Sequence, residues 1–456
     1  MMREPAFQPL PPPLPTPLVG RRLLVLGLGD TGLSVARWAE REGAAVRIAD
    51  SRREPPRMKD FRGELRTGRF TEALLDGVDA VCVSPGLSLD EEVVRQAVLR
   101  GLPVFGDIEL FAWHARQPVL AVTGTNGKST VTALAGHLLR SAGVDCEVAG
   151  NIGPPVFDSM LKRLDAGKLP RAWVLELSSY QLETTWSLAP AAAAMLNLTE
   201  DHLDRYATLE EYGAAKARIF MGAGAQILNR DDPRSVAMAQ TGKTVLTFGL
   251  DAPPTPKDFG VAGGKLVQGR KAILAVDELP IRGSHNVANA LAACALVSIL
   301  DADPVAGLRT FKGLPHRLQL VATRRGVEWY DDSKGTNVGA TVAALRGLGR
   351  QAVLILGGDG KGQDFSPLRG PVREFASHVL LIGRDAPLIE KVVAGERCVS
   401  LEAAVQRAAA LAKPGEAVLL SPACASFDMF RDYRHRGEVF AQAVGRLAPA
   451  TEGPSS

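Results

Sequence analysis

The stretch from Val119 to Val131, VLAVTGTNGKSTV, constrains this chain more than any other part of its sequence. Its first four residues are apolar, as expected of a buried parallel strand. A glycine-rich turn follows at 123–130, and a helical pattern then has Val131, Leu134, Leu138 and Leu139 on one face. A strand, such a turn and a helix N-terminus form a cradle in which backbone N–H groups, the helix dipole and a lysine bind phosphate. We therefore predict a nucleotide phosphate site, against the alternative that Gly-Lys-Ser occurs here by chance in a surface loop.

Composition excludes several classes of protein. A length of 456 residues predicts two to four domains, and a formal charge of +3 without a basic stripe gives no reason to expect nucleic acid as a partner. The five cysteines are scattered without a C-x-x-C pair, which is typical of a protein in the reducing cytosol. No apolar run reaches the roughly eighteen residues of a membrane span, and the proline-rich tail at 1–20 lacks the apolar core of a signal peptide. We therefore expect a cytoplasmic protein that does not enter a membrane.

The first ordered segment contains a glycine-rich turn between two predicted strands. The strand at 23–26 runs into Gly27-Leu28-Gly29-Asp30-Thr31-Gly32, and the strand at 46–49 ends in Asp50. Glycines that allow a tight turn, followed about twenty residues later by an acid that can bind a ribose hydroxyl, form the dinucleotide fingerprint. The same arrangement can hold NAD or a uridine nucleotide, or can be merely structural. A second strand-to-loop site follows at 80–86, and we place the end of this domain near residue 107.

Two polar positions follow predicted strands of the middle segment. The strand at 172–175 ends at Glu176, where a nucleotide-bound Mg²⁺ is usually held downstream of a phosphate loop. The apolar run at 191–196 leads into a loop of acids, 197–204, that contains His202. This position predicts a metal or substrate role for His202. An ordinary loop acid at Glu176 and a plain surface loop around His202 are the alternatives.

A helix is predicted to begin at Thr208, because Glu211 three residues later completes a capping box. Lys216 lies in the interior of that helix. A solvated helix lysine is its ordinary interpretation, and elementary physics favours it. The small residues of the stretch 213–217 nevertheless permit this face to pack closely against another element.

A polar loop at 283–289 leads into an apolar helix at 290–300, and could either cap that helix or contact a nucleotide base.

The remaining sequence predicts one more domain. Apolar strands at 352–356, 379–382 and 417–420 each end in small and polar residues, as in a doubly wound sheet with its loops on one edge. We expect an α/β protein of three domains, each built on a mostly parallel sheet: a Rossmann-like N-terminal domain at 21–107, a central P-loop ATPase-like domain at 108–313 and a Rossmann-like C-terminal domain at 314–456.

Taken in order, these motifs resemble the Mur ligases, the ATP-dependent amino-acid-adding enzymes of peptidoglycan synthesis. The resemblance covers nearly everything from Leu23 to Gly437, and rests on Gly124–Thr130, Glu176, Asn197–Asp204, Tyr212–Ile219, Leu228–Pro233, Gly283–Asn289, His316-Arg317 and Asp331–Asn337. The family's phosphate loop has the Gly-Thr-Asn-Gly-Lys form, so the valine at 122, where the usual Walker A motif has its first glycine, is expected. The N-terminal turn, Gly357–Lys361 and Leu420–Asp428 resemble the members that add D-glutamate.

The resemblance implies roles for individual residues. The implied ATP-binding positions are Gly124, Thr125, Asn126, Gly127, Lys128, Ser129, Thr130, Asn286, Arg317, Asp332 and Lys334. UDP-N-acetylmuramoyl-L-alanine would contact Asp30, Thr31, Asp50, Ser51, Ser84 and Asn151. D-Glutamate would contact Thr336, Lys361, Ser426, Phe427 and Tyr433. The implied catalytic residues are Lys128, Glu176, His202 and Lys216, and the implied Mg²⁺ ligands are Ser129, Glu176, His202 and Lys216, the last as a carbamate.

The reaction implied by the resemblance uses ATP and Mg²⁺ and passes through an acyl phosphate. Its partners are small molecules, and we expect a monomer. Another amino-acid-adding ligase of the same family is one alternative. A nicotinamide-dependent oxidoreductase would rest on 27–50 alone, and would leave the phosphate loop and Glu176 without a purpose. A non-catalytic nucleotide switch would need the phosphate loop but no D-glutamate pocket.

Overall fold

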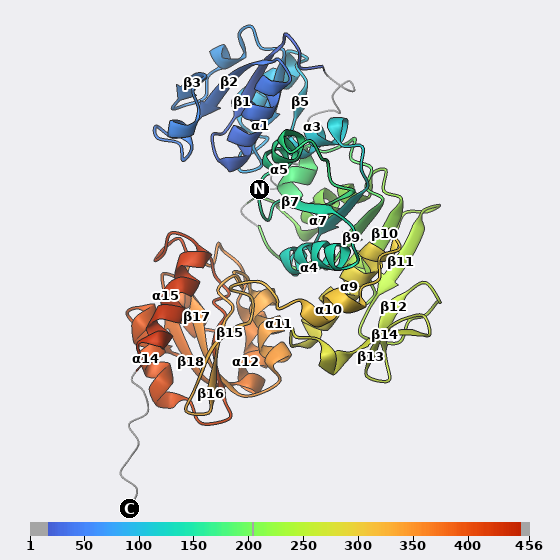
Figure 1. Cartoon of the computed structure of the whole chain (residues 1–456). Coiled ribbons are helices and arrows are strands. Elements are labelled where there is room, and N and C mark those ends of the chain that lie inside the picture. The colour runs from blue at the N-terminus through green and yellow to red at the C-terminus, as the bar shows by residue number, and fades with distance from the viewer. Residues whose placement is uncertain (1–16, 203–204, 448–456) are drawn as a thin grey trace, which may run out of the picture. The chain divides into compact units, whose positions relative to one another are not determined.

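The computed structural model describes residues 17–202 and 205–447, which divide into two compact units. The first unit contains the described residues up to Leu198, with Arg205–Ile273 and Leu291–Leu308. The second contains the described part of Thr199–Asp204, with Leu274–Ala290 and the described residues from Arg309 onward. Three sheets with helices on their faces build the two units (Figure 1), so the predicted three-part α/β architecture is confirmed. Of the predicted tail at 1–20 only residues 17–20 are described, and Leu18 among them is buried in the first core.

The N-terminal sheet is entirely parallel. Its strands are β1 (Arg22–Leu26), β2 (Ala45–Asp50), β3 (Glu64–Thr67), β4 (Ala80–Val83) and β5 (Val104–Phe105), in the order β3-β2-β1-β4-β5. The accompanying helices are α1 (Asp30–Arg41), α2 (Glu92–Leu99) and α3 (Asp107–His114). The strand order reverses between β1 and β4, and ligands of such sheets bind in the crevice at this reversal. A Cβ on Gly32 would lie 1.9 Å from the carbonyl oxygen of Gly27, so the turn after β1 requires a glycine there.

The central sheet has nine strands and is parallel over its larger part. Its strands are β6 (Val119–Thr123), β7 (Cys146–Gly150), β8 (Ala172–Glu176), β9 (Ala192–Met195), β10 (Ala225–Asn229), β11 (Thr244–Phe248), β12 (Phe259–Ala262), β13 (Lys265–Gln268) and β14 (Lys271–Ala275), in the order β14-β13-β12-β11-β10-β9-β6-β8-β7. The helices are α4 (Lys128–Ser141), α5 (Val156–Asp165), α6 (Ser179–Glu183), α7 (Leu209–Ala217), α8 (Pro233–Val236), α9 (Ser284–Ser298) and α10 (Val305–Thr310). The antiparallel hairpin of β12 and β13 was not predicted. Gly263 and Gly264 form its turn, with φ of 55° and 71°, as a two-residue hairpin requires.

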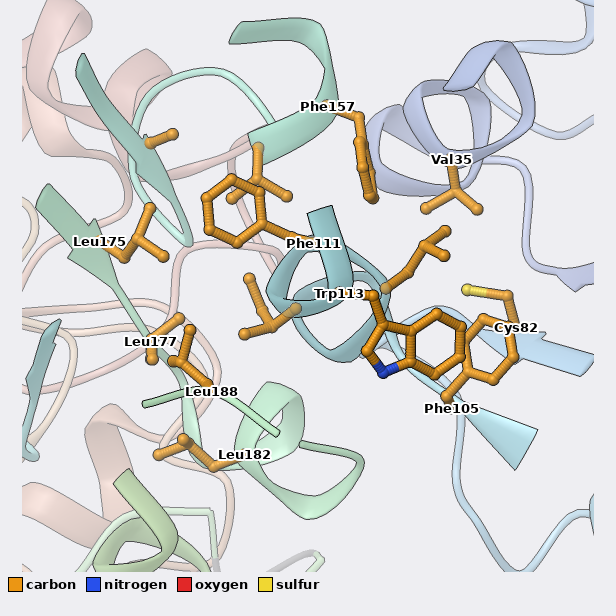
Figure 2. Packing of buried hydrophobic residues seen from close by; sticks show 14 of the residues in the cluster. Val35, Cys82, Phe105, Phe111, Trp113, Phe157, Leu175, Leu177, Leu182 and Leu188 are labelled. Carbon is orange, nitrogen blue, oxygen red and sulfur yellow. The ribbon is translucent and has the colours of Figure 1, made fainter. Parts of the chain in front are cut away.

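A continuous hydrophobic core joins the N-terminal and central sheets within the first unit. Figure 2 shows α3 in the middle of this core, with Phe111 and Trp113 between side chains of the two sheets. Trp113 meets Phe105 edge-on at a ring separation of 4.7 Å, and Phe111 meets Trp173 in the same way at 5.2 Å. The predicted boundary at 107/108 therefore falls at the start of a helix that packs in a core common to both sheets.

The C-terminal sheet is covered on both faces. Its strands are β15 (Gln319–Arg324), β16 (Val327–Asp331), β17 (Ala352–Gly357), β18 (Ala376–Ile382), β19 (Glu396–Arg397) and β20 (Ala417–Leu420), in the order β15-β16-β20-β17-β18-β19. Among the described strand pairs of this sheet, β15 and β16 are antiparallel and the others are parallel. The helices are α11 (Val338–Leu348), α12 (Arg369–Phe375), α13 (Ala386–Glu390), α14 (Leu401–Leu411) and α15 (Tyr433–Gly445). One core contains side chains of α11 and α12, and another contains side chains of α14 and α15. Figure 1 shows these two pairs of helices on opposite faces of the sheet, so the sheet is doubly wound as predicted. None of the described helices is long and apolar enough to cross a membrane.

Candidate active site

The predicted phosphate cradle folds as a strand, a loop and a helix N-terminus. β6 ends at Thr123, the loop occupies 124–127, and α4 begins at Lys128. Gly124 has φ +149° and Gly127, the N-cap residue, has φ +86°, both conformations that favour glycine. The Val131 N–H donates to the Gly127 carbonyl at 3.0 Å, so the N–H groups of residues 128–130 are directed out of the helix end. This geometry suits an anion such as a phosphate.

Asn197, which follows β9, holds the middle of the loop. Its side-chain Oδ1 accepts from the Asn126 N–H at 2.8 Å, and its Nδ2 donates to the Asn126 carbonyl at 3.0 Å. Its backbone carbonyl accepts from the Thr125 N–H at 2.8 Å. The N–H groups of Thr125 and Asn126 are thus engaged by Asn197, so a nucleotide contact from these two predicted residues would come from their side chains.

Two lysines converge on the first residue of the loop. Lys128 Nζ donates to the carbonyl oxygens of Gly124 and Thr125, at 2.8 Å each. Lys216 Nζ donates to the Gly124 carbonyl at 2.9 Å, and lies 4.5 Å from the ring centre of Tyr212. Only 1% of Lys216 is exposed, so its interpretation as a solvated helix lysine is wrong. The small residues act as predicted, since a Cβ on Gly213 would lie 2.8 Å from Leu198.

Glu176 is a buried carboxylate next to the phosphate loop. It ends β8 and is paired with Val122 of β6. Its Oε1 accepts from Asn151 Nδ2 at 2.7 Å, whereas its Oε2 is buried without a hydrogen-bond partner among the described residues. An unpartnered carboxylate oxygen is costly to bury, and a cation would satisfy it. Ser129, 1% exposed in the first turn of α4, supplies a hydroxyl of the kind that accompanies such a carboxylate.

His202 belongs to the second unit, whereas Ser129, Glu176 and Lys216 belong to the first. Its backbone has φ +57°, and its N–H donates to Asp201 Oδ1 at 3.0 Å. Within 17–202 and 205–447, no three or more His, Cys, Asp or Glu side chains form a group that could hold a metal ion. A metal site shared by the four predicted residues therefore stays a prediction. Residues 203 and 204 of the predicted acidic loop lie outside the described residues.

A cavity of about 540 Å³ opens at the strand-order reversal of the N-terminal sheet. All six residues predicted to bind the UDP-linked substrate line it: Asp30, Thr31, Asp50, Ser51, Ser84 and Asn151. Arg52 and Gln181 line it too, and were not predicted. That this cavity binds a uridine nucleotide stays a prediction, but the structure does bring the six residues together.

Asp50 stabilises the glycine-rich turn at the edge of this cavity. Its Oδ2 accepts from the Leu28 N–H at 2.7 Å, and the Arg52 guanidinium donates to both carboxylate oxygens at 2.6 and 2.8 Å. Burial alone would raise the pKa of Asp50, but the hydrogen bonds from Arg52 and Leu28 outweigh it and lower the pKa. The carboxylate is therefore ionised, and it holds the turn at the edge of the cavity.

The C-terminal sheet gathers a second set of predicted residues at one edge. Asp332 follows β16, and its Oδ2 accepts from Ser421 Oγ, which follows β20, at 2.7 Å. Burial raises the pKa of Asp332 to about 7, while Ser421 and the charge of Arg317 act in the opposite direction. The Lys334 ammonium lies 4.9 Å from the ring centre of Tyr433. Burial would raise the pKa of Tyr433, but the nearby positive charges, Lys334 first, lower it.

The loops that carry the predicted D-glutamate residues are joined. Asp359 and Ala425 exchange two backbone hydrogen bonds of 2.8 and 3.0 Å, which brings the loop of Lys361 beside the loop of Ser426. Lys361 is exposed, with φ +51°, and Ser426 is buried. Phe427 is 72% exposed, and the Thr336 N–H donates to the Lys334 carbonyl at 2.9 Å.

The predicted loop at 283–289 before a helix at 290 is wrong, because α9 already begins at Ser284, and polar side chains in its first turns are held locally. Asn286 Nδ2 donates to the Arg282 carbonyl at 2.8 Å, and Asn289 Nδ2 donates to Asn286 Oδ1 at 3.2 Å. Burial lowers the pKa of the neighbouring His285 to about 4, and the charge of Arg317 adds to this effect. A nucleotide contact by Asn286 and Arg317 stays a prediction.

One structural residue of the second unit was missed. Arg436 is fully buried; it donates to Ser333 Oγ at 3.0 Å, to the Ser333 carbonyl at 2.7 Å and to the Cys424 carbonyl at 3.1 Å. It thereby ties the strand-end loop of Lys334 to that of Ser426. No local pattern announces such a residue, because its partners lie far away in the sequence.

Family models match successive parts of the chain. The Mur ligase MurD-like N-terminal domain matches residues 21–106, the Mur ligase middle domain matches 122–297, and the Mur ligase glutamate ligase domain matches 316–424. A protein of Nitrosospira multiformis named UDP-N-acetylmuramoylalanine--D-glutamate ligase is 52% identical over 96% of this chain and 98% of its own length. A protein of the same name from Thiobacillus denitrificans is 54% identical over 94% of this chain and 97% of its own length.

Solved structures share the fold at much lower identity. The MurF ligase of Thermotoga maritima in complex with ADP has a TM-score of 0.59 at 17% identity, and the match covers 95% of this chain and 100% of that one. The UDP-N-acetylmuramate-alanine ligase MurC of the same organism has a TM-score of 0.58 at 18% identity, covering 92% of this chain and 98% of that one. From the full-length relatives and the successive domain matches, the chain belongs to the Mur ligase family.

Proposed function

We propose that this protein is the ATP-dependent ligase that adds D-glutamate to UDP-N-acetylmuramoyl-L-alanine in peptidoglycan precursor synthesis. The observation that carries the proposal is the phosphate cradle at α4 with the buried carboxylate of Glu176 beside it, in a chain about half identical to relatives named for this reaction. These relatives favour the D-glutamate-adding ligase over other members of the family. A nicotinamide enzyme is disfavoured, since it would leave the phosphate loop and Glu176 without a purpose.

The chemistry divides into two displacements. The carboxylate of the UDP-linked substrate attacks the γ-phosphorus of ATP, which yields an acyl phosphate and ADP. The amine of D-glutamate then attacks the acyl carbon and phosphate leaves, so that an amide bond forms and the amine gives up a proton. Catalysis of the first step is chiefly positioning and charge neutralisation. Lys128 and the N–H groups at the start of α4 are the groups that would bind the β- and γ-phosphates.

ATP and Mg²⁺ are the cofactors of the proposal. Glu176 and Ser129 would hold one Mg²⁺, which fits the unpartnered, buried Oε2 of Glu176. His202 and a carbamylated Lys216 would hold a second. Bound Mg²⁺ would neutralise the charge that develops on the phosphate oxygens. Asn286, Arg317, Asp332 and Lys334 would contribute further nucleotide contacts.

The carbamate at Lys216 is part of the proposal. It forms when the neutral amine attacks CO₂ and loses a proton, and it replaces a cation by an anion. An ammonium has no lone pair for Mg²⁺, whereas a carbamate offers oxygen ligands. The burial of Lys216 supports this role, because burial favours the neutral amine that carbamylation requires.

The two substrates would use separate units. UDP-N-acetylmuramoyl-L-alanine would occupy the cavity lined by Asp50, Ser84 and Asn151 in the first unit. D-Glutamate would be bound in the second unit, by Thr336, Lys361, Ser426, Phe427 and Tyr433. We propose that the protein works as a monomer in the cytoplasm, where ATP and UDP-linked precursors are available.

Phosphate release tests the proposal. Release from ATP should require UDP-N-acetylmuramoyl-L-alanine, and its steady rate should depend on D-glutamate. ATP binding without amino-acid-stimulated release would favour a nucleotide switch. Faster release with another amino acid would favour another ligase of the family.

A further inference from the structure

We propose that Asn197 is a positioning residue of the nucleotide site, which fixes one half of the phosphate loop so that the other half faces the phosphates. The proposal rests on the ATP-dependent function proposed above and concerns how the loop keeps its shape. The hydrogen bonds of the Asn197 side chain go to the loop, so its effect on ATP would act through the loop.

The contacts of Asn197 are reciprocal. Its Oδ1 accepts from the Asn126 N–H at 2.8 Å while its Nδ2 donates to the Asn126 carbonyl at 3.0 Å. Its own carbonyl accepts from the Thr125 N–H at 2.8 Å. An asparagine side chain carries one acceptor and one donor group, so it satisfies both backbone groups of Asn126 at once. Aspartate has no donor for the carbonyl, and alanine has neither group.

These contacts divide the loop into two halves. The N–H groups of Thr125 and Asn126 point to Asn197 and are not directed at a phosphate. The N–H groups of residues 127–130 lie at the N-terminus of α4, where the helix dipole favours an anion. Without the Asn197 side chain, the N–H and carbonyl groups of Asn126 would lose these two hydrogen bonds, and the loop would lose order that ATP binding then has to restore.

Asn197 is itself held from both sides. Asn229 Nδ2 donates to the Leu196 carbonyl at 2.8 Å, and Asp232 Oδ2 accepts from the Leu198 N–H at 2.6 Å. Both residues belong to the stretch Leu228–Pro233, which the sequence marks as a motif without suggesting a task. Asn229 and Asp232 therefore fix the backbone on either side of Asn197, and Asn197 in turn holds the phosphate loop.

Calorimetric titration with ATP and Mg²⁺ tests the proposal on Asn197→Ala and Asn197→Asp. Two lost hydrogen bonds predict a Kd for ATP raised about 10- to 30-fold in Asn197→Ala. Asn197→Asp should not restore binding, because the carboxylate repels the Asn126 carbonyl. UDP binding at the cavity of the N-terminal sheet should be unchanged, and so reports correct folding. If Asn197→Ala fails to bind UDP, the Kd of Asn197→Asp for ATP decides the test.

Gln226→Ala is the matched control. Gln226 is a buried amide on β10 whose Oε1 accepts from the backbone N–H of Gln240 at 2.8 Å, away from the phosphate loop. Its loss should lower the melting temperature and leave the Kd for ATP unchanged. A purely structural role for Asn197 would give the same result as this control, a lower melting temperature with ATP binding intact, and would overturn the proposal.

Amide hydrogen exchange supplies the second readout. In the unliganded wild-type protein the Asn126 N–H should exchange slowly, and in Asn197→Ala it should exchange fast, whereas the Thr125 N–H keeps its bond to the backbone carbonyl of residue 197. Added ATP should protect residues 127–130 of the wild type. Protection of the Asn126 N–H that is unchanged in Asn197→Ala would contradict the assignment. Failure of the wild type to bind ATP at all would instead refute the proposed function, so the two failures are distinguishable.

Discussion

The ammonium groups of Lys128 and Lys216 both donate to the carbonyl oxygen of Gly124, at 2.8 and 2.9 Å. The two lysines come from different helices, α4 and α7, and Lys216 is separated from Gly124 by 92 positions. One carbonyl at the start of the phosphate loop therefore gathers both cations. Conversion of Lys216 to a carbamate would remove one of these cations and place an anion beside the loop.

Lys216→Ala should lose most activity, because the anionic ligand of the proposed carbamate disappears. Acetate should restore part of the activity by occupying the vacated position. Lys216→Arg should stay inactive, since guanidinium keeps its charge and is not carbamylated. Steady-state rates with and without acetate are the measurement. A fully active Lys216→Arg enzyme would show that the carbamate is not needed.

Selectivity for the amino acid should depend on Lys361. A lysine and the hydroxyl of Ser426 on adjoining loops suit a side-chain carboxylate. Lys361→Ala should raise the KM for D-glutamate on the order of 10- to 100-fold, as the loss of a charge-assisted hydrogen bond does. The KM for ATP serves as the internal control and should hardly change. Preference of the wild type for L-glutamate, D-alanine or a diamino acid would contradict the D-glutamate assignment.

The burial of Asp332 predicts a pH-dependent stability. Its pKa in the folded protein is raised to about 7 from an ordinary 3.8, so the folded state binds more protons than the unfolded state between these values. Its contribution to stability is therefore full below about pH 4 and is lost as the pH rises through 7. Relative to Asp332→Asn, the wild type should become less stable between pH 5 and pH 8. Equal melting-temperature differences at both pH values would argue that Asp332 ionises normally.

The turn after β1 should not accept a side chain at Gly32. A Cβ there would lie 1.9 Å from the Gly27 carbonyl oxygen, a backbone atom that cannot move aside cheaply. Gly32→Ala should cost about 1–3 kcal/mol of stability and weaken UDP binding. Gly29→Ala is the matched control for stability, because a Cβ at Gly29 meets no atom within 4 Å. Equal melting temperatures of the two variants would mean that the turn has more room than the structure shows.

The strands were the most predictable elements, because each is a short apolar run before small or polar residues. The runs at 80–83 and 417–420 coincide with β4 and β20.

The capping box at Thr208 is only half present. Thr208 Oγ1 accepts from the Glu211 N–H at 3.2 Å, but the Glu211 carboxylate accepts from Ala207 N–H at 2.9 Å instead of from Thr208. Local patterns thus predict the helix start, whereas the partner of a flexible side chain depends on the exact backbone.

The parts of the site that escaped prediction depend on contacts between distant residues. Lys216 lies in a helix whose small neighbours give no amphipathic pattern, so the sequence could not tell its buried face from a solvated one. Asn197 contacts Asn126 across 71 positions, and Arg436 contacts Ser333 across 103. The position of Glu176 beside the phosphate loop was predictable, because adjacent parallel strands end at the same edge of a sheet.

The most direct test of the proposed reaction counts its product. Wild-type protein with ATP, Mg²⁺, UDP-N-acetylmuramoyl-L-alanine and D-glutamate should form one UDP-N-acetylmuramoyl-L-alanyl-D-glutamate, identified by mass spectrometry, for each phosphate released. Lys128→Ala should fold and bind UDP normally, yet lose on the order of 10²–10³ in rate or more, because a phosphate contact made in the transition state is gone. Absence of this product from the wild-type reaction, or near-normal turnover by Lys128→Ala, would contradict the account.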